Sequence, residues 1–325
     1  MTALTHPIPV ILDGDPGHDD AIAWLLAAAF QKQGLLDIRA ITTVGGNAPL
    51  DKTTYNMLRI ATLYGLKTRA NGEPIPMAAG CARPLVQEPQ SAPSVHGESG
   101  LDGPALPEPE LATVDQSAVE LMAQVLSESA EPIVIVPTGP LTNVATLLRD
   151  HSELKPKIAR ISLMGGGILA GNWSPAAEFN IMVDPEAAKI VFNSGIPLTM
   201  AGLDVTNKAY VTFADEQRVR DVGGELAEVV ADWLDFFYRF HKQLGYPGGP
   251  VHDPVAVAVL VHPEIFDIRD MYVDVETTGT HGWGATIGDY YEVSGRPANV
   301  SVIMGLNREA FVDLIVEAVE TVKGK

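Results

Sequence analysis

The densest group of reactive side chains lies near the start of the chain, in Asp13-Gly14-Asp15-Pro16-Gly17-His18-Asp19-Asp20. This segment holds four carboxylates within eight residues, between two apolar runs. At a separation of ~5 Å and an effective dielectric constant of about 20, each pair of like charges costs roughly 3 kcal/mol. A bound divalent cation would offset that repulsion for the whole set. Because all candidate ligands are oxygen atoms, a hard ion such as Ca²⁺ or Mg²⁺ fits best.

Helix capping is the alternative explanation for these carboxylates. Asp19 or Asp20 in the first turn of a helix would interact favourably with the helix dipole. Capping accounts for one or two of the four carboxylates, whereas a cation accounts for all of them. We therefore predict a metal site here.

Polar residues and glycines also follow several other predicted strands. They are Gly45-Gly46-Asn47, Thr138-Gly139-Pro140, Gly165-Gly166-Gly167 and Asp204. Any one of them is ordinary turn chemistry. In open α/β sheets, however, ligands bind in the crevice outside the carboxyl ends of the strands. Because these residues converge on the same predicted edge as the aspartate cluster, we predict that the crevice is the active site.

Two histidines lie in segments that could reach this crevice. His96 opens HGESGLDG, and His252 directly precedes Asp253 in PGGPVHDP. A lone histidine is more often a satisfied structural residue. Asp253 could also simply cap the helix that follows, with Pro254 at its first position. Since capping and metal ligation are not exclusive, the pattern leaves both roles open.

Common nucleotide and serine-hydrolase motifs are absent from the sequence. The segment GGGILAG at 165–171 lacks the G-x-G-x-x-G spacing, and no G-x-x-x-x-G-K-[ST] occurs. No G-x-S-x-G elbow occurs either. Dinucleotide chemistry and serine hydrolysis are therefore disfavoured.

The elements that must position these residues alternate between strands and helices. Strands are expected at 8–12, 38–44, 133–136, 158–164 and 197–201. Helices are expected at 19–32, 51–64, 225–243 and 255–261, from an Asp184 cap to a closing Gly195, and behind an Asn307 cap. This order predicts an α/β fold with an open, mostly parallel central sheet flanked by helices, in a single domain over 1–325.

Residues 84–109 interrupt this alternation with six prolines. The stretch could be an interdomain linker. Because strand and helix patterns resume beyond it, we interpret it as an insertion within one domain, and long insertions of this kind are often active-site loops.

Composition excludes several classes of partner and location. Asp and Glu number 41 against 22 Lys and Arg, so the formal charge is −19, which disfavours nucleic acid and anionic membranes as partners. Cys81 is the single cysteine, so neither an intrachain disulfide nor a thiolate zinc site can form. MTALTHPIPV does not resemble a secretion signal, and the longest apolar stretch, 21–30, is too short for a membrane helix. We expect a cytoplasmic protein.

Six segments together resemble the inosine–uridine preferring nucleoside hydrolase family. They are VILDGDPGHDDAIA (10–23), AITTVGGN (40–47), HGESGLDGP (96–104), VPTGPLTNVA (136–145), MGGG (164–167) with AEFNIMVDPEAA (177–188), and VHDPVAVA (251–258). The resemblance implies one Ca²⁺ in the crevice and hydrolysis of the N-glycosidic bond of ribonucleosides to ribose and free base, a step of nucleoside salvage. It also implies a homo-oligomer.

The resemblance assigns roles residue by residue. The implied metal ligands are the carboxylates of Asp15, Asp20 and Asp253 and the backbone carbonyl of Thr138. The implied ribose-binding residues are Asp19, Asn47, Asn172, Glu178 and Asn180, with Met164 lining the same pocket. Asp15 is the implied base toward the attacking water. His252 is the implied acid toward the leaving base, and His96 lies near the base pocket as the other candidate for that proton transfer.

Two other functions remain open from the sequence. A metal-dependent phosphohydrolase could use Asp13 as nucleophile in a D-x-D pattern, although Gly17 stands where that pattern has Thr or Val. A non-catalytic nucleoside- or sugar-binding module could retain the pocket without the chemistry. Aromatic residues near the expected mouth could stack on a base or pack in the core; they are Trp173, Phe179, Phe236, Phe237 and Tyr238.

Overall fold

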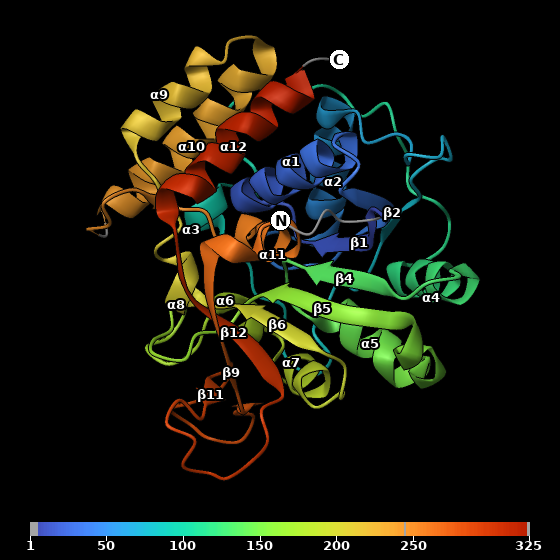
Figure 1. Ribbon diagram of the computed structural model, residues 1–325, viewed down its shortest axis with the longest axis vertical. Coiled ribbons are helices and arrows are strands. Elements are labelled where there is room, and N and C mark those ends of the chain that lie inside the picture. The colour runs from blue at the N-terminus through green and yellow to red at the C-terminus, as the bar shows by residue number, and fades with distance from the viewer. Residues whose placement is uncertain (1–5, 244, 324–325) are drawn as a thin grey trace.

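The computed structural model of the chain describes residues 6–243 and 245–323. The first five residues of the stretch MTALTHPIPV lie outside the described residues. Within the described part, eight strands form one central sheet in the order β3-β2-β1-β4-β5-β6-β12-β9 (Figure 1). Neighbouring strands run parallel except β9, which is antiparallel to β12. The predicted mostly parallel α/β sheet is confirmed.

The strands of the central sheet are β1 (Ile8–Gly14), β2 (Leu36–Thr43), β3 (Met77–Ala79), β4 (Ile133–Pro137), β5 (Ile158–Met164), β6 (Leu198–Ala201), β9 (Phe266–Met271) and β12 (Val300–Leu306). Two small antiparallel sheets pair β7 (Tyr210–Val211) with β8 (Gly249–Pro250), and β10 (Val273–Val275) with β11 (Thr286–Gly288). The longer helices are α1 (His18–Lys32), α2 (Leu50–Tyr64), α4 (Ala118–Glu128), α5 (Thr142–Asp150), α7 (Pro185–Phe192), α9 (Phe213–Asp221), α10 (Glu225–Gln243), α11 (Pro254–Val261) and α12 (Arg308–Lys323). Short helices are α3 (Pro93–His96), α6 (Phe179–Val183) and α8 (Leu203–Thr206), with 3-10 turns at Ser152–Lys157 and Pro263–Ile265.

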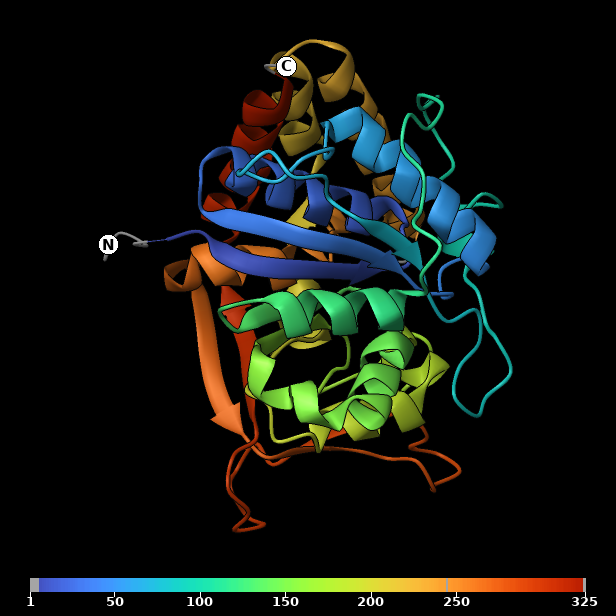
Figure 2. The same cartoon turned by 90° about the vertical axis from the view of Figure 1, so that its right-hand side faces the viewer.

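Helices cover both faces of the sheet, as Figures 1 and 2 show. Side chains of β1 alternate between two cores, because successive strand residues point to opposite faces. Val10 and Leu12 pack with α1, α10, α11 and α12, whereas Ile11 packs with α4, α5 and α7. Burial on both faces explains why these strands read as continuous apolar runs.

Helix α1 is buried along almost its whole length. Every residue from His18 to Phe30 is buried, because α1 lies against the sheet and also contacts α11 and α12. This enclosure fixes the position of the aspartates in its first turn. In the described part of the chain, no helix is long and apolar enough to cross a membrane.

The proline-rich stretch 84–109 lies within one domain. Strand β3 precedes it and pairs with β2, and α4 follows it and leads into β4 of the same sheet. The backbone N–H of Leu85 donates to the carboxylate of Asp184 at 2.9 Å, which fastens the start of the stretch to the cap of α7. A linker between domains would not return to the same sheet.

The expected end of α7 is wrong. The cap at its start is as predicted, since the carboxylate of Asp184 accepts from the N–H of Ala187. The helix ends at Phe192 with Asn193 as its C-cap. Gly195 instead adopts a φ of 78° in the turn that leads to β6.

Candidate active site

The turn between β1 and α1 brings its aspartates to the carboxyl edge of the sheet. Asp20 lies in the first turn of α1, and its Oδ2 accepts from the N–H of Gly17 at 3.0 Å, so capping explains one of its oxygens. Its Oδ1 accepts from the hydroxyl of Thr138 at 2.6 Å. Asp20 thereby joins the turn after β1 to the turn after β4.

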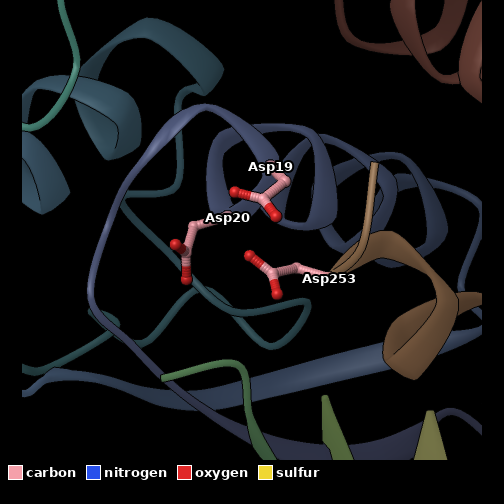
Figure 3. A group of neighbouring side chains, drawn as sticks. All are labelled: Asp19, Asp20 and Asp253. Carbon is pink, nitrogen blue, oxygen red and sulfur yellow. The ribbon is translucent and has the colours of Figure 1, made fainter. Parts of the chain in front are cut away.

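Three carboxylates from distant parts of the chain meet at this edge. Asp19 and Asp20 of α1 and Asp253 at the start of α11 offer oxygens that all lie within 4.8 Å of one another. Figure 3 shows the three carboxyl groups directed toward a common point. Asp253 occupies the N-cap of α11, but its side chain makes no capping hydrogen bond. Capping therefore does not explain why this position carries a carboxylate.

Asp15 lies beside this group but outside it. Its Oδ2 accepts from the N–H of Asn47 at 2.6 Å, and its Oδ1 is buried without a hydrogen-bond partner among the described residues. Two glycines make room for it: a Cβ at Gly46 would lie 2.0 Å from Oδ2, and one at Gly139 would lie 2.6 Å from Oδ1. Of the expected carboxylate ligands, Asp20 and Asp253 thus meet, together with Asp19.

Burial raises the pKa of every carboxyl group in this set. The pKa of Asp19 rises to about 8 through burial and the neighbouring charge of Asp20. Burial likewise raises the pKa of Asp15 and Asp253 well above the usual value, with further contributions from the other aspartates. The pKa of Asp20 rises to about 6, mainly through burial. Without a counter-charge, the folded protein therefore favours protons on these groups.

The donor set fits a hard divalent cation. The site offers several buried carboxylates, and two of their oxygens, on Asp15 and Asp19, have no hydrogen-bond partner among the described residues. The residues that line the adjoining cavity include no Lys or Arg. Unpaired buried carboxylates are strongly unfavourable unless a metal or another cation compensates them. Oxygen ligands of this kind suit Ca²⁺ or Mg²⁺.

Asp13 is separated from the cavity. It is 1% exposed, and its Oδ1 accepts from Thr42 Oγ1 and Asn143 Nδ2, both at 2.8 Å. It is absent from the cavity lining. Its partners Thr42 and Asn143 do not line the cavity either, whereas Asp15 accepts from the lining residue Asn47. This position therefore does not support Asp13 as the nucleophile of a phosphohydrolase.

A cavity of about 210 Å³ lies above the carboxylates and contains most of the expected site residues. Those that line it are Asp19, Asn47, His96, Thr138, Met164, Asn172, Glu178, Asn180, His252 and Asp253. Asp15 and Asp20 do not line it, although each contacts or adjoins residues that do. Of the segments predicted to form the crevice, 45–47 and 138–140 contribute the lining residues Asn47 and Thr138, whereas 165–167 and Asp204 do not line the cavity.

The expected sugar-binding side chains are held by local hydrogen bonds. Glu178 caps α6 and accepts from the N–H groups of Gly166, Asn180 and Ile181 at 2.8 to 3.2 Å. Burial raises the pKa of Glu178 to about 7. The amide of Asn180 donates to the carbonyl of Thr138 at 2.9 Å, so this carbonyl already has one partner. These bonds fix the side chains before any ligand binds.

Two of the cavity histidines are those that the sequence singled out. His252 Nδ1 lies 2.8 Å from the hydroxyl of Thr206, and burial lowers its pKa to about 3, with a smaller effect from His241. His96 lies at the end of α3, and burial lowers its pKa well below the usual value. Burial therefore favours the neutral form of both imidazoles.

Aromatic residues enclose the cavity in part. Trp173, Phe179 and Phe237 line it, whereas Phe236 stacks on His18 with a ring separation of 4.6 Å. Tyr238 is not among the lining residues. Trp173 packs edge-on against Phe179 and donates from Nε1 to the side chain of Gln90 at 2.9 Å. The stretch 84–109 thus forms part of the cavity wall.

Six lining residues were not named from the sequence. Ala92, Ser94 and Val95 lie in the stretch 84–109, which was predicted as an active-site loop, and the other three are Asn207, His241 and Tyr246. The last three lie between 205 and 250, where no motif marks them. His18 was also overlooked as a partner of His96, although their Nδ1 atoms lie 3.2 Å apart. Only the packing of α3 against α1 brings that pair together.

Comparison with known proteins agrees with the geometry of the site. The family model described as inosine-uridine preferring nucleoside hydrolase matches residues 10–313. The pyrimidine-specific ribonucleoside hydrolase RihA of Salmonella paratyphi B is 52% identical over 315 residues, which cover 96% of this chain and 98% of that protein.

Two solved structures also share the fold. The purine-preferring ribonucleoside hydrolase from Gardnerella vaginalis has a TM-score of 0.87 at 29% identity and covers 97% of this chain and 99% of its own. The plant nucleoside hydrolase PpNRh1 has a TM-score of 0.85 at 29% identity, with the same coverage. The family match, the near-complete alignment and the carboxylate-floored cavity agree that this chain belongs to the inosine–uridine preferring nucleoside hydrolase family.

Proposed function

We propose that this protein hydrolyses the N-glycosidic bond of pyrimidine ribonucleosides to ribose and free base, and that it requires Ca²⁺. A relative named as pyrimidine-specific is 52% identical over nearly the whole chain, whereas a structural neighbour named as purine-preferring is 29% identical. This difference supports uridine and cytidine as the better substrates.

One observation carries the proposal: three buried carboxylates converge, and two of them, Asp19 and Asp253, line a cavity that also holds polar side chains suited to a sugar. We propose that Asp15, Asp20, Asp253 and the carbonyl of Thr138 hold the cation, with Asp19 close enough to contribute. When bound, the cation would orient the vicinal hydroxyls of ribose and activate a water molecule. Binding as well as chemistry would then depend on the same carboxylates.

The side chains of this chain supply the other parts of the mechanism. Cleavage of a C1′–N bond builds positive charge on the sugar, as in glycoside hydrolysis. We propose Asp15 as the base that takes a proton from the attacking water, because it contacts the lining residue Asn47 and one of its buried oxygens has no hydrogen-bond partner among the described residues. The carboxylates of Asp19 and Glu178 stabilise the developing charge, and Asn47, Asn172 and Asn180 hold the hydroxyls by hydrogen bonds.

The leaving base needs a proton, and His252 is the proposed donor. Its Nδ1 is engaged by Thr206, which leaves Nε2 as the ring nitrogen free to serve the base. A neutral imidazole can donate from Nε2 when its proton is there. The homo-oligomer and the cytoplasmic location expected from the sequence stay predictions.

Chromatography of base release tests the proposal. The protein is incubated with uridine, cytidine, inosine and adenosine, first with Ca²⁺, then with a chelator, then with Ca²⁺ restored. We expect uracil and cytosine to be released fastest, release to stop on chelation, and activity to return with Ca²⁺. We also expect 2′-deoxyuridine to react at least about 100-fold more slowly, since buried polar groups would lose their hydroxyl partner.

Three results would contradict the proposal. Tight nucleoside binding without base release would indicate a binding module. Phosphate release from p-nitrophenyl phosphate would indicate a phosphohydrolase. Unchanged base release in the presence of the chelator would remove the role of the cation.

A further inference from the structure

Asn207 differs from the other asparagines that line the cavity. The other three, Asn47, Asn172 and Asn180, each hydrogen-bond through the side chain to a backbone group, at 2.9 to 3.2 Å. Asn207 forms no side-chain hydrogen bond within the described part of the chain, and neither polar atom of its amide is fully enclosed. Its amide is therefore available to a ligand in the cavity.

The backbone at Asn207 is held in place by α8. Asn207 is the C-cap of this helix, and its N–H donates to the carbonyl of Leu203 at 3.2 Å. The helix itself is fastened to the loop after β5, because the carboxylate of Asp204 accepts from the N–H groups of Ile168 and Leu169 at 2.7 and 3.1 Å. The Asn207 amide is thus presented from a fixed backbone, and only its side-chain torsions remain to be set by a ligand.

Asn207 belongs to the end of the cavity where His252 lies. The residue before it, Thr206, has its hydroxyl 2.8 Å from Nδ1 of His252. Asn207 and His252 both line the cavity. In the proposed function His252 serves the leaving base, so this is the end where the base lies. The inference rests on the proposed function at this step.

Aromatic rings give this end of the cavity a shape suited to a planar base. The ring centroids of Phe237 and His241 lie 4.4 Å apart, and they lie 6.4 and 6.3 Å from that of His252. Tyr246 packs edge-on against His241 at 5.5 Å, and all four residues line the cavity. Stacking on rings accepts any base, because every base has a π-face. Selection among bases therefore needs a polar group that meets the edge of the base, and Asn207 offers one.

A primary amide can match the edge of uracil and that of cytosine. It presents an N–H donor and a carbonyl acceptor side by side. Uracil has N3–H beside O4, whereas cytosine has an unprotonated N3 beside its 4-amino group. Half a turn of the amide about Cβ–Cγ exchanges donor and acceptor, so one asparagine pairs with either base. The edge formed by N3 and O2 does not fit, because in cytosine both of those atoms accept.

We propose that Asn207 is a specificity-determining residue that hydrogen-bonds N3 and the 4-substituent of a pyrimidine base. A purine carries the corresponding edge on its second ring, further from the glycosidic bond, so a side chain placed for a pyrimidine does not meet it. The amide N–H also stabilises the negative charge that develops on the leaving base, as donors aimed at a developing anion do.

Asn207→Leu tests this role, because it removes both hydrogen-bonding groups and keeps the approximate size of the side chain. We expect kcat/KM for uridine and cytidine to fall about five- to tenfold, as the loss of a hydrogen bond does, and that for inosine to fall less. Asn71→Leu is the matched control, since Asn71 is exposed and does not line the cavity, and its kcat/KM values should equal those of the wild type.

A ratio of substrates guards this test against misfolding. The uridine-to-inosine ratio of kcat/KM within one preparation does not depend on the fraction of folded protein. The ratio should fall in Asn207→Leu and also in the smaller variant Asn207→Ala. A ratio equal to that of the wild type in both variants would overturn the inference.

3-Methyluridine identifies the edge of the base, because its methyl group replaces the N3–H. We expect the wild type to hydrolyse it at least about tenfold less efficiently than uridine, and the penalty to be much smaller in Asn207→Leu. Dissociation constants of both nucleosides, measured by calorimetry, give the same comparison without the chemical step. Base release with equal penalties in the two proteins would contradict the inference alone. Unequal penalties in binding without base release would contradict the proposed function alone.

Discussion

At the scale of single residues, the central feature is a set of carboxylates without compensating charge. Asp15, Asp19 and Asp253 are buried, their pKa values are raised, and no lysine or arginine lines the adjoining cavity. Such groups lower the stability of the folded chain unless a cation binds. A protein retains them only where they serve a ligand.

Asp15 has two proposed roles, as the base toward the water and as a ligand of the cation, so its variant is assayed at saturating Ca²⁺. Asp15→Asn preserves the shape of the side chain and can still accept from the N–H of Asn47, but it cannot take a proton. We expect kcat for uridine to fall by about 10²- to 10⁴-fold, the usual contribution of a general base, with the melting temperature nearly unchanged. Steady-state kinetics and circular dichroism measure the two effects. A fully active Asp15→Asn variant would remove Asp15 as the base.

At the scale of elements, the loops after the strands place these residues through close backbone approach. The turn after β2 passes so near Asp15 that any side chain at Gly46 would collide with the carboxylate. The turn after β4 does the same through Gly139 and also contributes Thr138. Glycine is needed at these positions because a side chain would displace the carboxylate of Asp15, and not only because of the turn conformation.

Gly46→Ala tests this requirement. Its Cβ would lie 2.0 Å from Asp15 Oδ2, so the carboxylate must move. Displacement of a catalytic group by about 1 Å can cost about 100-fold in rate, and we expect a loss of that order in kcat/KM. Gly282→Ala is the matched control, because its Cβ would meet only Glu276 Cγ at 3.5 Å. Full activity of Gly46→Ala would show that Asp15 need not stay where it is.

The bounds of a strand or helix can be predicted from the sequence where neighbouring residues determine them. The bounds of β5 at Ile158–Met164 match the prediction, and three glycines follow directly after the strand. Gly195 misled the prediction of α7, since glycine in a following turn and glycine as a C-cap look alike in sequence. Strands β9 and β12 were not foreseen, because their pairing depends on contacts between distant segments.

The site is predictable only in part for the same reason. The aspartates of the first turn and Asp253 can be recognised from the sequence as candidate metal ligands by their residue type. The residues expected around the sugar line the cavity. Asn207, His241 and Tyr246 carry no motif. Asn207 follows α8, His241 lies in α10 and Tyr246 follows α10, so their place at the cavity depends on how these segments pack together. The contact of His18 with His96 likewise depends on tertiary packing.

At the scale of the whole molecule, the net charge of −19 favours cations, as the carboxylates of the site do. A negative field raises the local concentration of cations and lowers that of anions. It therefore assists the binding of Ca²⁺ and does not hinder a neutral nucleoside. The same field opposes phosphorylated substrates.

The free energy of unfolding should fall as pH rises, and a bound cation should offset that loss. The pKa of Glu178 is raised to about 7 and that of Asp19 to about 8, so the folded chain binds protons that the unfolded chain releases near pH 4. Stability is therefore lost as pH rises through the folded values. His18 and His252, with pKa values lowered to about 4 and about 3, oppose this trend only below about pH 6.5.

We accordingly expect the melting temperature of chelator-treated protein to fall between about pH 6.5 and 8.5. Added Ca²⁺ should raise it more at pH 8.5 than at pH 6.5, because protons and the cation compete for the same carboxylates. Differential scanning calorimetry at both values measures the effect. A melting temperature that rises with pH in the chelator would contradict the assignment of these buried groups.

Calorimetric titration of Ca²⁺ into metal-free protein at pH 8 tests most directly whether the converging carboxylates hold a cation. We expect one site per chain in the wild type. The affinity should be at least about tenfold weaker in Asp253→Asn, which loses one ligand charge. It should be unchanged in Asp221→Asn, which removes the same charge from the surface of α9. Absence of binding in the wild type, or equal affinity in Asp253→Asn, would contradict the account.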